Sequence, residues 1–279
     1  MSASERSRDP LRDRLVAGVG SAPVLGLLRP LRRWLRRGRQ PVPFPPAWAK
    51  ILDERVPLAR ALPEADRHEL EQLVVVFLDE KTFEGAGGLT ITDEMRVTIA
   101  AQACLLLLHR DTDVYPDLDT VVVYPSAYVA PETRHEGPVV IEDESVRLGE
   151  SWQRGLVVLA WDAVRGTMVN ERDGHNVVLH EFAHQLDAED GVVDGAPDLG
   201  KRARYATWAR VLGDAYADLV ARIHAGRDTD IDAYGATSPP EFFAVVTEMF
   251  FEKPARLKAR HPELYATLAD FYQQDPAAL

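Results

Sequence analysis

The sequence predicts an α+β protein that is mostly helical and carries a small β-sheet. Helical patterns come first along the chain, short β-rich segments follow near its middle, and helical patterns return after them. The 279 residues are 46% hydrophobic and 27% charged, which is typical of a globular protein able to bury a core. No internal repeat is visible. We therefore predict one principal domain over residues 41–279, preceded by a basic tail over residues 1–40.

The charge of the chain is unevenly distributed between these two parts. Residues 1–40 contain ten Arg, no Lys and three acidic residues, a net charge of +7. Because the whole chain carries −12, the remaining 239 residues carry −19. An acidic body is a poor partner for a phosphate backbone, so we expect no nucleic-acid partner.

The tail has competing interpretations. The uncharged stretch 15–28 contains Pro23 and three glycines, no clear cleavage site follows it, and it is too short to span a bilayer. The Arg-rich segment 31–37 can form a short basic helix on an anionic membrane surface. The alternative is a solvated tail, or residues upstream of the true start. Prolines at 41, 43, 45 and 46 then indicate a stiff linker.

Three helices are expected before the sheet, over residues 47–62, 64–83 and 95–109. Glycines near residue 85 break the pattern, and Thr92 is suited to cap the third helix. That helix is apolar on several faces, so we expect it to be buried. It contains Cys104, which as the only cysteine excludes an internal disulfide and a multi-cysteine metal site. We interpret it as a buried apolar residue.

Four short strands and four further helices complete the predicted elements. The strands are expected at residues 120–124, 127–130, 138–141 and 156–161. The last of these is either an edge strand able to pair with an extended peptide or a plain core strand. The helices are expected at residues 176–188, 201–225, 239–252 and 254–271.

The pattern H-E-x-x-H at residues 180–184 carries the chemical signal. Residues four apart lie on one face of a helix, so His180 and His184 can present two imidazoles to one ion. Zinc at a catalytic site needs three protein ligands and an open position for water. Glu181 is placed to act as general base and acid on that water. The opposite face of the helix is an apolar stripe.

The third ligand must come from another segment, and several carboxylates qualify. A metzincin would carry Gly and a third His where this chain has Asp187 and Asp190, although Asp190 remains a candidate. Glu241 and Glu248 lie on one face of a later helix, and their spacing does not separate them. Ser238 and Glu241 also form a capping box, which gives Glu241 a purely structural explanation.

Three other polar residues near the motif have open roles. Glu248 either orients a ligand histidine or is an ordinary helix charge. His175 precedes the helix and is expected to be a capping or surface residue. Asp187 can hydrogen-bond near His184 or cap a neighbouring segment.

Beyond the motif itself, several longer stretches resemble one family. The stretches are residues 93–103 (DEMRVTIAAQA), 123–126 (VYPS), 149–152 (GESW), 180–187 (HEFAHQLD), 231–234 (IDAY), 240–245 (PEFFAV) and 271–276 (FYQQDP). Together they make the chain similar to the Mlc titration factor A family of bacterial zinc peptidases. The resemblance runs from about Phe44 to Pro276 and leaves the first forty residues outside.

The resemblance implies a zincin-like domain of the gluzincin type, similar to the catalytic domain of anthrax lethal factor, with its small sheet beside the H-E-x-x-H helix. Carried over by position, His180, His184 and Glu241 would hold one Zn²⁺ per chain. Glu181 would be the base, and Tyr234 would hydrogen-bond the oxyanion. Each of these residues is present, so the motif gives no sign of a dead enzyme.

The expected function is therefore hydrolysis of peptide bonds by a zinc-dependent peptidase in the cytoplasm. The resemblance implies short substrates and the trimming of amino termini, as in an aminopeptidase. The alternative is a regulatory protein that binds and sequesters a transcriptional repressor, with catalysis secondary.

Overall fold

The structure is a computed structural model that describes residues 42–126, 128–136, 139–147, 149–150, 155–169 and 173–279. For residues 128–136, 139–147, 149–150 and 168–169 it describes the backbone alone. The described residues belong to one compact unit, Pro41–Leu279. The tail and its Arg-rich segment lie outside them. No helix in the described part of the chain is long and apolar enough to cross a membrane.

Four helices come before residue 106 in the described part of the chain: α3 (Pro46–Arg55), α4 (Pro57–Arg60), α5 (Glu64–Glu80) and α6 (Asp93–Leu105). The helix predicted over residues 47–62 is broken at Val56, because Pro57 has no N–H to continue the hydrogen-bond ladder. Thr92 caps α6 as predicted, and its side chain accepts a hydrogen bond from the Met95 N–H at 3.3 Å. Cys104 is fully buried in α6, and burial raises the pKa of its thiol.

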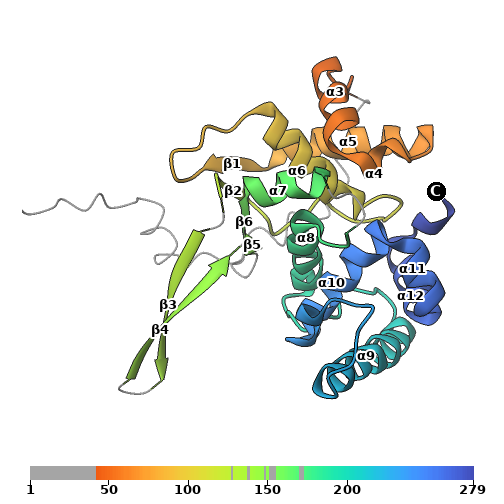
Figure 1. Ribbon diagram of the computed structural model, residues 1–279. Coiled ribbons are helices and arrows are strands. Elements are labelled where there is room, and N and C mark those ends of the chain that lie inside the picture. Colours follow the sequence, from red (N-terminus) through yellow and green to blue (C-terminus); the bar gives the residue numbers. More distant parts are fainter. Residues whose placement is uncertain (1–41, 127, 137–138, 148, 151–154, 170–172) are drawn as a thin grey trace, which may run out of the picture. The chain divides into compact units, whose positions relative to one another are not determined.

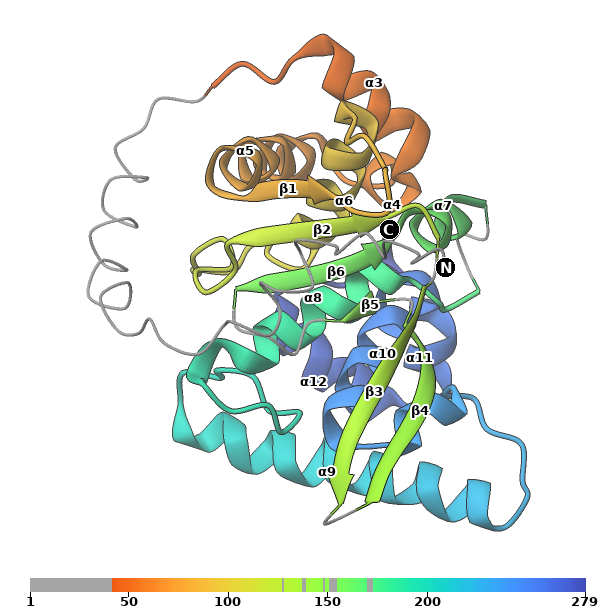
Figure 2. The ribbon, with the colours of Figure 1, turned by 90° about the vertical axis from the view of Figure 1, so that its left-hand side faces the viewer.

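The sheet has the order β1-β2-β6-β5, formed by β1 (Thr82–Gly85), β2 (Thr120–Tyr124), β6 (Leu156–Ala160) and β5 (Gly149–Glu150). Strands β1, β2 and β6 are parallel, and β5 is antiparallel to β6 (Figure 2). Strand β6 thus lies between two partners, so the interpretation of residues 156–161 as an edge strand is wrong. The inner residues of β2 and β6 are buried, as expected of a core strand.

A separate antiparallel hairpin joins β3 (Tyr128–Glu136) to β4 (Val139–Arg147). Both strands are longer than the predicted 127–130 and 138–141, whose residues 127 and 138 lie outside the described part of the chain. After β6 comes α7 (Trp161–Val169), which the sequence did not predict.

The second half of the described chain is helical. It contains α8 (Val177–Asp187), η2 (Ala188–Asp190), α9 (Arg202–His224), η3 (Ala233–Ala236), α10 (Pro239–Glu252), α11 (Pro254–Arg260), α12 (Pro262–Tyr272) and η4 (Pro276–Ala278). Proline divides the predicted helix 254–271 at residue 262. Figure 1 shows α8 and α10 side by side, and these two helices make an extensive mutual contact.

The core fixes α8 in place. Phe182 is fully buried and packs against Tyr115 and against Phe77 of α5, with ring centroids 4.8 and 5.7 Å apart. Helix α10 is buried along almost its whole length. The described residues therefore form a mostly helical α+β fold in which two buried helices meet along one seam.

Candidate metal centre

Helix α8 is anchored at its first turn and along its inner face. Asn176 is the N-cap, and its Oδ1 accepts hydrogen bonds from the N–H groups of Val178 and Leu179 at 3.1 and 3.0 Å. The predicted apolar stripe is fully buried; its members are Val178, Leu179, Phe182, Ala183 and Leu186. This packing turns the histidine face of α8 towards α10.

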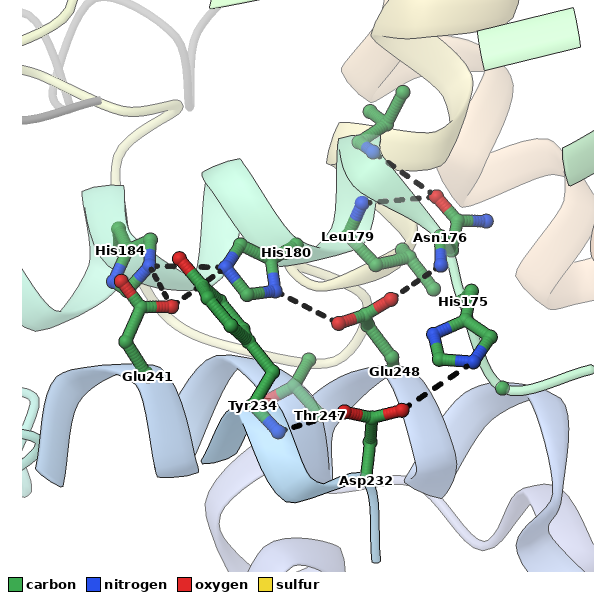
Figure 3. A network of polar contacts seen from close by, with 12 residues as sticks. His175, Asn176, Leu179, His180, His184, Asp232, Tyr234, Glu241, Thr247 and Glu248 are labelled. Carbon is green, nitrogen blue, oxygen red and sulfur yellow. Dashed lines mark hydrogen bonds and ion pairs between the residues drawn. The ribbon is translucent and has the colours of Figure 1, made fainter. Parts of the chain in front are cut away.

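Two imidazoles and one carboxylate converge on a single point between α8 and α10. Glu241 Oε2 lies 3.0 Å from His180 Nε2 and 3.5 Å from His184 Nε2, and the two Nε2 atoms are 3.3 Å apart (Figure 3). The ligand atoms of the three residues all lie within 4.8 Å of one another. They are close enough to bind a metal ion. Glu241 and His184 are buried, and His180 is largely so.

The start of α10 presents Glu241 to the histidines. Ser238 caps the helix, and its hydroxyl accepts a hydrogen bond from the Glu241 N–H at 3.4 Å. The side chain of Glu241, however, reaches His180 and His184. Glu241 can therefore take part in the helix cap and serve as a metal ligand at the same time. The cap uses its backbone N–H, and metal binding would use its carboxylate.

The charges of these side chains are strongly coupled. Burial alone would lower the pKa of His180, but hydrogen bonds to Glu241 and Glu248 raise it to about 10. Burial alone would raise the pKa of Glu241, but its contacts with His180 and His184 lower it to about 2. Burial lowers the pKa of His184. These shifts therefore favour an anionic Glu241 carboxylate that pairs with a protonated His180, while His184 favours its neutral form.

Glu248 orients the first histidine, seven residues after Glu241 on the same helix. Its Oε1 lies 2.7 Å from His180 Nδ1, and its Oε2 accepts a hydrogen bond from the Asn176 N–H. With Nδ1 held in this way, the Nε2 of His180 is left facing Glu241. The structure thus separates the two glutamates that spacing alone could not distinguish.

Tyr234 lies on the η3 turn, and its ring centroid is 5.9 Å from that of His180. Figure 3 shows the side chain extending from η3 towards the two histidines. Asp232 fixes the turn, because its Oδ1 accepts a hydrogen bond from the Tyr234 N–H at 2.7 Å and its Oδ2 lies 3.6 Å from His175 Nε2. Burial and nearby carboxylates, Glu241 first among them, raise the pKa of Tyr234 to about 12. The phenol therefore stays protonated and able to donate.

Glu181 is buried in the same site, with 5% of its surface exposed. Its charge acts on both His180 and Tyr234, contributing to the raised pKa of each. The three potential ligands, His180, His184 and Glu241, form the donor cluster. The Glu181 carboxylate therefore lies within electrostatic reach of one of its members, His180, and of the neighbouring Tyr234.

Other predicted candidates lie elsewhere. Asp190 is exposed at the end of η2, where its Oδ1 accepts a hydrogen bond from the Val192 N–H. Asp187 is buried and binds the backbone of Gly195. Neither belongs to the group of potential ligands found among the described residues. His175 is exposed, as expected.

One buried residue of this region was missed. Glu252 lies four residues after Glu248 on α10, is 4% exposed, and accepts a hydrogen bond from Asn176 Nδ2 at 3.0 Å. The i, i+4 spacing from Glu248 was the available signal.

An H-E-x-x-H helix packed against a helix that carries a carboxylate, within an α+β fold, defines a candidate metal centre of the histidine–carboxylate type.

Comparison with known proteins gives the family. The chain belongs to the glucose-regulated metallo-peptidase M90 family, whose model matches residues 31–273. The match includes residues 31–40, which the motifs had left outside the resemblance. Membership indicates a metallopeptidase and agrees with the metal-binding capacity of His180, His184 and Glu241.

Individual relatives cover most of the chain. An uncharacterised protein of Synechocystis is 45% identical over 236 residues, 84% of this chain and 86% of that protein. Mlc titration factor A of Klebsiella pneumoniae is 31% identical over 83% of this chain and 87% of its own length. Mlc titration factor A of Yersinia pestis is 30% identical over 88% and 91%. These matches support the family resemblance expressed by the motifs.

Proposed function

We propose that the protein is a zinc-dependent peptidase of zincin-like architecture. The observation that carries this proposal is the convergence of His180, His184 and Glu241 beside the buried carboxylate of Glu181. We further propose that residues 41–279 form the single peptidase domain, that residues 1–40 are its tail, and that it acts in the cytoplasm on short peptides from their amino termini.

The donor set fits zinc. Two imidazole nitrogens and one carboxylate oxygen are the ligands found at catalytic zinc sites, which keep a further position open. Sulfur ligands are not needed, which agrees with the burial of the single cysteine, Cys104. A zinc ion held there would supply Lewis-acid chemistry and activate water.

The chain's own residues then move the protons and hold the developing charge. Glu181 takes a proton from the water whose oxygen bonds to the scissile carbonyl carbon. It returns that proton to the amine nitrogen as the C–N bond breaks, so protons balance over the cycle. Tyr234, kept neutral by its raised pKa, donates a hydrogen bond to the carbonyl oxygen as that oxygen becomes negative.

The test compares the zinc-loaded wild type with Glu181→Gln on a panel of chromogenic aminoacyl and peptide substrates. The substitution keeps the ligands and removes the base, so we expect kcat to fall about 10²- to 10⁴-fold with zinc retained. Glu263 is an exposed carboxylate of α12, so Glu263→Gln serves as the control and should keep full activity. Equal activity of Glu181→Gln and wild type would refute the assigned base.

A second candidate function comes from the relatives' name. Mlc titration factor A is named for the titration of Mlc, and this points to capture of a transcriptional regulator. We propose it as the alternative, with catalysis secondary. The test is a pull-down from native lysate with zinc-loaded and metal-free protein, followed by release of the captured regulator from its operator DNA. Absence of a regulator in both pull-downs would end this alternative.

A further inference from the structure

Helix α10 presents three buried glutamates to α8. Glu241, Glu248 and Glu252 are each no more than 5% exposed, and their spacings of seven and four place them on one helix face. Burying a carboxylate without partners is costly, so each must be satisfied by hydrogen bonds. The first two act on the histidines directly. Glu252 contacts neither histidine and is satisfied by another part of the chain.

Glu252 holds the segment from which α8 begins. Its Oε2 accepts a hydrogen bond from the Gly174 N–H at 3.0 Å, and its Oε1 accepts one from Asn176 Nδ2 at 3.0 Å. Asn176 Nδ2 also donates to Gln102 Oε1 on α6 at 2.8 Å. The amide of the N-cap is therefore fixed between α10 and α6.

A continuous chain of hydrogen bonds leads from this anchor to the candidate metal centre. Asn176 donates through Nδ2 to Glu252 and through its backbone N–H to Glu248, and Glu248 in turn contacts His180 Nδ1. His180 lies one helical turn after Asn176, so a rotation of the first turn of α8 would move Nε2 away from Glu241 Oε2. Figure 3 shows Asn176, Glu248 and His180 in this sequence.

We propose that Glu252 is a positioning residue which, through Asn176, fixes the first turn of α8 and thereby aims His180 at the metal. The inference deepens the proposed function and rests on it for the identity of the ion. Partners of ligand histidines typically change metal affinity 10- to 100-fold when they are removed. Two residues, Asn176 and Glu248, lie between Glu252 and His180 in this chain of contacts, so the effect belongs at the lower end of that range.

The protonation of Glu252 supplies a conservative variant. Burial, with Glu248 and Asp173 nearby, raises the pKa of Glu252 to about 8, against the opposing hydrogen bonds from Asn176 and Gly174. The raised pKa favours the neutral acid, and glutamine shares its shape. Glu252→Gln keeps a carbonyl acceptor for Asn176 and loses only the acceptor for the Gly174 N–H, whereas Glu252→Ala removes both acceptors.

The experiment measures the zinc dissociation constant of the full-length chain by competition with a chromogenic chelator. We expect Glu252→Ala to bind zinc about tenfold more weakly than wild type and Glu252→Gln to stay within about threefold. Asn176→Ser keeps the capping oxygen and lacks the amide donor, so it should resemble Glu252→Ala. It gives a second route should the alanine variant fail to fold.

Thr247→Val is the matched control. Thr247 is buried on α10, and its hydroxyl pairs with that of Tyr272 at 2.8 Å, a partner on α12 instead of α8. The Thr247→Val substitution removes a buried hydrogen bond made by the same helix. It should therefore lower the free energy of unfolding and leave the zinc affinity unchanged. Equal losses of affinity in Thr247→Val and Glu252→Ala would show general loosening and overturn the proposal. Wild-type affinity in both Glu252→Ala and Asn176→Ser would also overturn it.

Zinc affinity is measured without any peptide, so the two proposals fail separately. A tenfold loss of affinity in Glu252→Ala supports the positioning role even if the wild type cleaves none of the substrates. Peptide cleavage that depends on Glu181, combined with unchanged affinity in Glu252→Ala, would retain the proposed function and reject the positioning role.

Discussion

Asp187 is an ionisable residue buried at the end of α8. Both of its carboxylate oxygens accept a hydrogen bond from the Gly195 N–H, at 3.0 and 2.9 Å. Burial is the dominant effect and raises its pKa to about 6, although the hydrogen bonds from Gly195 act in the opposite direction. The folded protein therefore binds a proton at Asp187 more tightly than the unfolded chain does.

This linkage predicts a pH-dependent contribution to stability. A carboxyl group whose folded-state pKa is raised contributes fully below its unfolded pKa near 4 and loses that contribution as pH rises through about 6. The free energy of unfolding of wild type relative to Asp187→Asn should therefore fall by on the order of 2 kcal/mol between pH 4 and pH 7. Urea unfolding at several pH values measures it. A difference that does not change with pH would contradict the prediction.

The sequence predicted site residues only where the chemistry is local. His180, Glu181 and His184 follow from one helical motif, because their relation depends on helix geometry alone. Glu241 and Glu248 share a helix face, so only the packing of α10 against α8 decides which of them meets both Nε2 atoms. Family resemblance had selected Glu241 over Glu248 and had singled out Tyr234. The roles of all these residues as ligands, base and oxyanion donor remain predictions.

At the scale of elements, the loop after α8 packs closely against the start of α10 at one glycine, Gly195. Gly195 has φ of +83°, a conformation that residues with a Cβ rarely adopt. A Cβ added there would lie 2.6 Å from the carbonyl oxygen of Pro239, two residues before Glu241. Trp208 Nε1 donates to the Gly195 carbonyl at 2.8 Å and fixes the same point to α9.

Two glycine-to-alanine substitutions should have opposite effects. Gly195→Ala meets backbone and is strained, so we expect it to lower the free energy of unfolding by at least about 2 kcal/mol. Gly213 lies inside α9 with open space around it, and Gly213→Ala should raise stability by about 0.5–1 kcal/mol. Chemical denaturation of both variants tests the pair. A loss in Gly195→Ala no larger than a few tenths of a kcal/mol would refute the close approach.

Elements were predictable where their periodicity was long, as for α6, α8, α9 and α10. Two predicted helices are each divided into two in the structure, at Pro57 and Pro262. At both places the local effect of proline prevails over the periodic pattern. Strand β1 was missed because the predicted helix 64–83 ran into it, whereas α5 ends at Glu80. The strand has only four residues and no alternation, so its identity comes from parallel pairing with β2. The sequence left residues 156–161 open between an edge strand and a core strand, because strand order is a tertiary property.

At the scale of the whole molecule, the donor cluster joins segments far apart in the chain. His180 and Glu241 are 61 residues apart, and Glu248 is 72 residues from Asn176. The unfolded chain cannot present these donors together. An ion that binds the folded state alone therefore stabilises it by linkage.

Zinc should raise the free energy of unfolding of the wild-type protein by about 2.7 kcal/mol when the free zinc concentration is 100 times the dissociation constant. Glu241→Gln should lose most of this gain at the same zinc concentration, because the amide is a weaker donor than the carboxylate. Glu263→Gln should keep it. Denaturant unfolding with and without zinc measures the difference. An equal gain in wild type and Glu241→Gln would remove Glu241 from the donor set.

The α+β class followed from the order of patterns along the chain, since helices before and after a short β-rich region leave few other arrangements. The seam between α8 and α10 did not follow from it. That seam depends on Phe182 being buried against Tyr115 and Phe77, residues contributed by distant parts of the sequence.

The separation of the donors along the chain also has a consequence for the newly made protein. At about 5–20 residues per second, the ribosome adds Glu241 roughly 3 to 12 seconds after His180. During that interval α8 exists without the helix that completes the cluster. A nascent chain therefore carries no assembled donor cluster, and the three potential ligands can meet only after α10 has been synthesised and has docked.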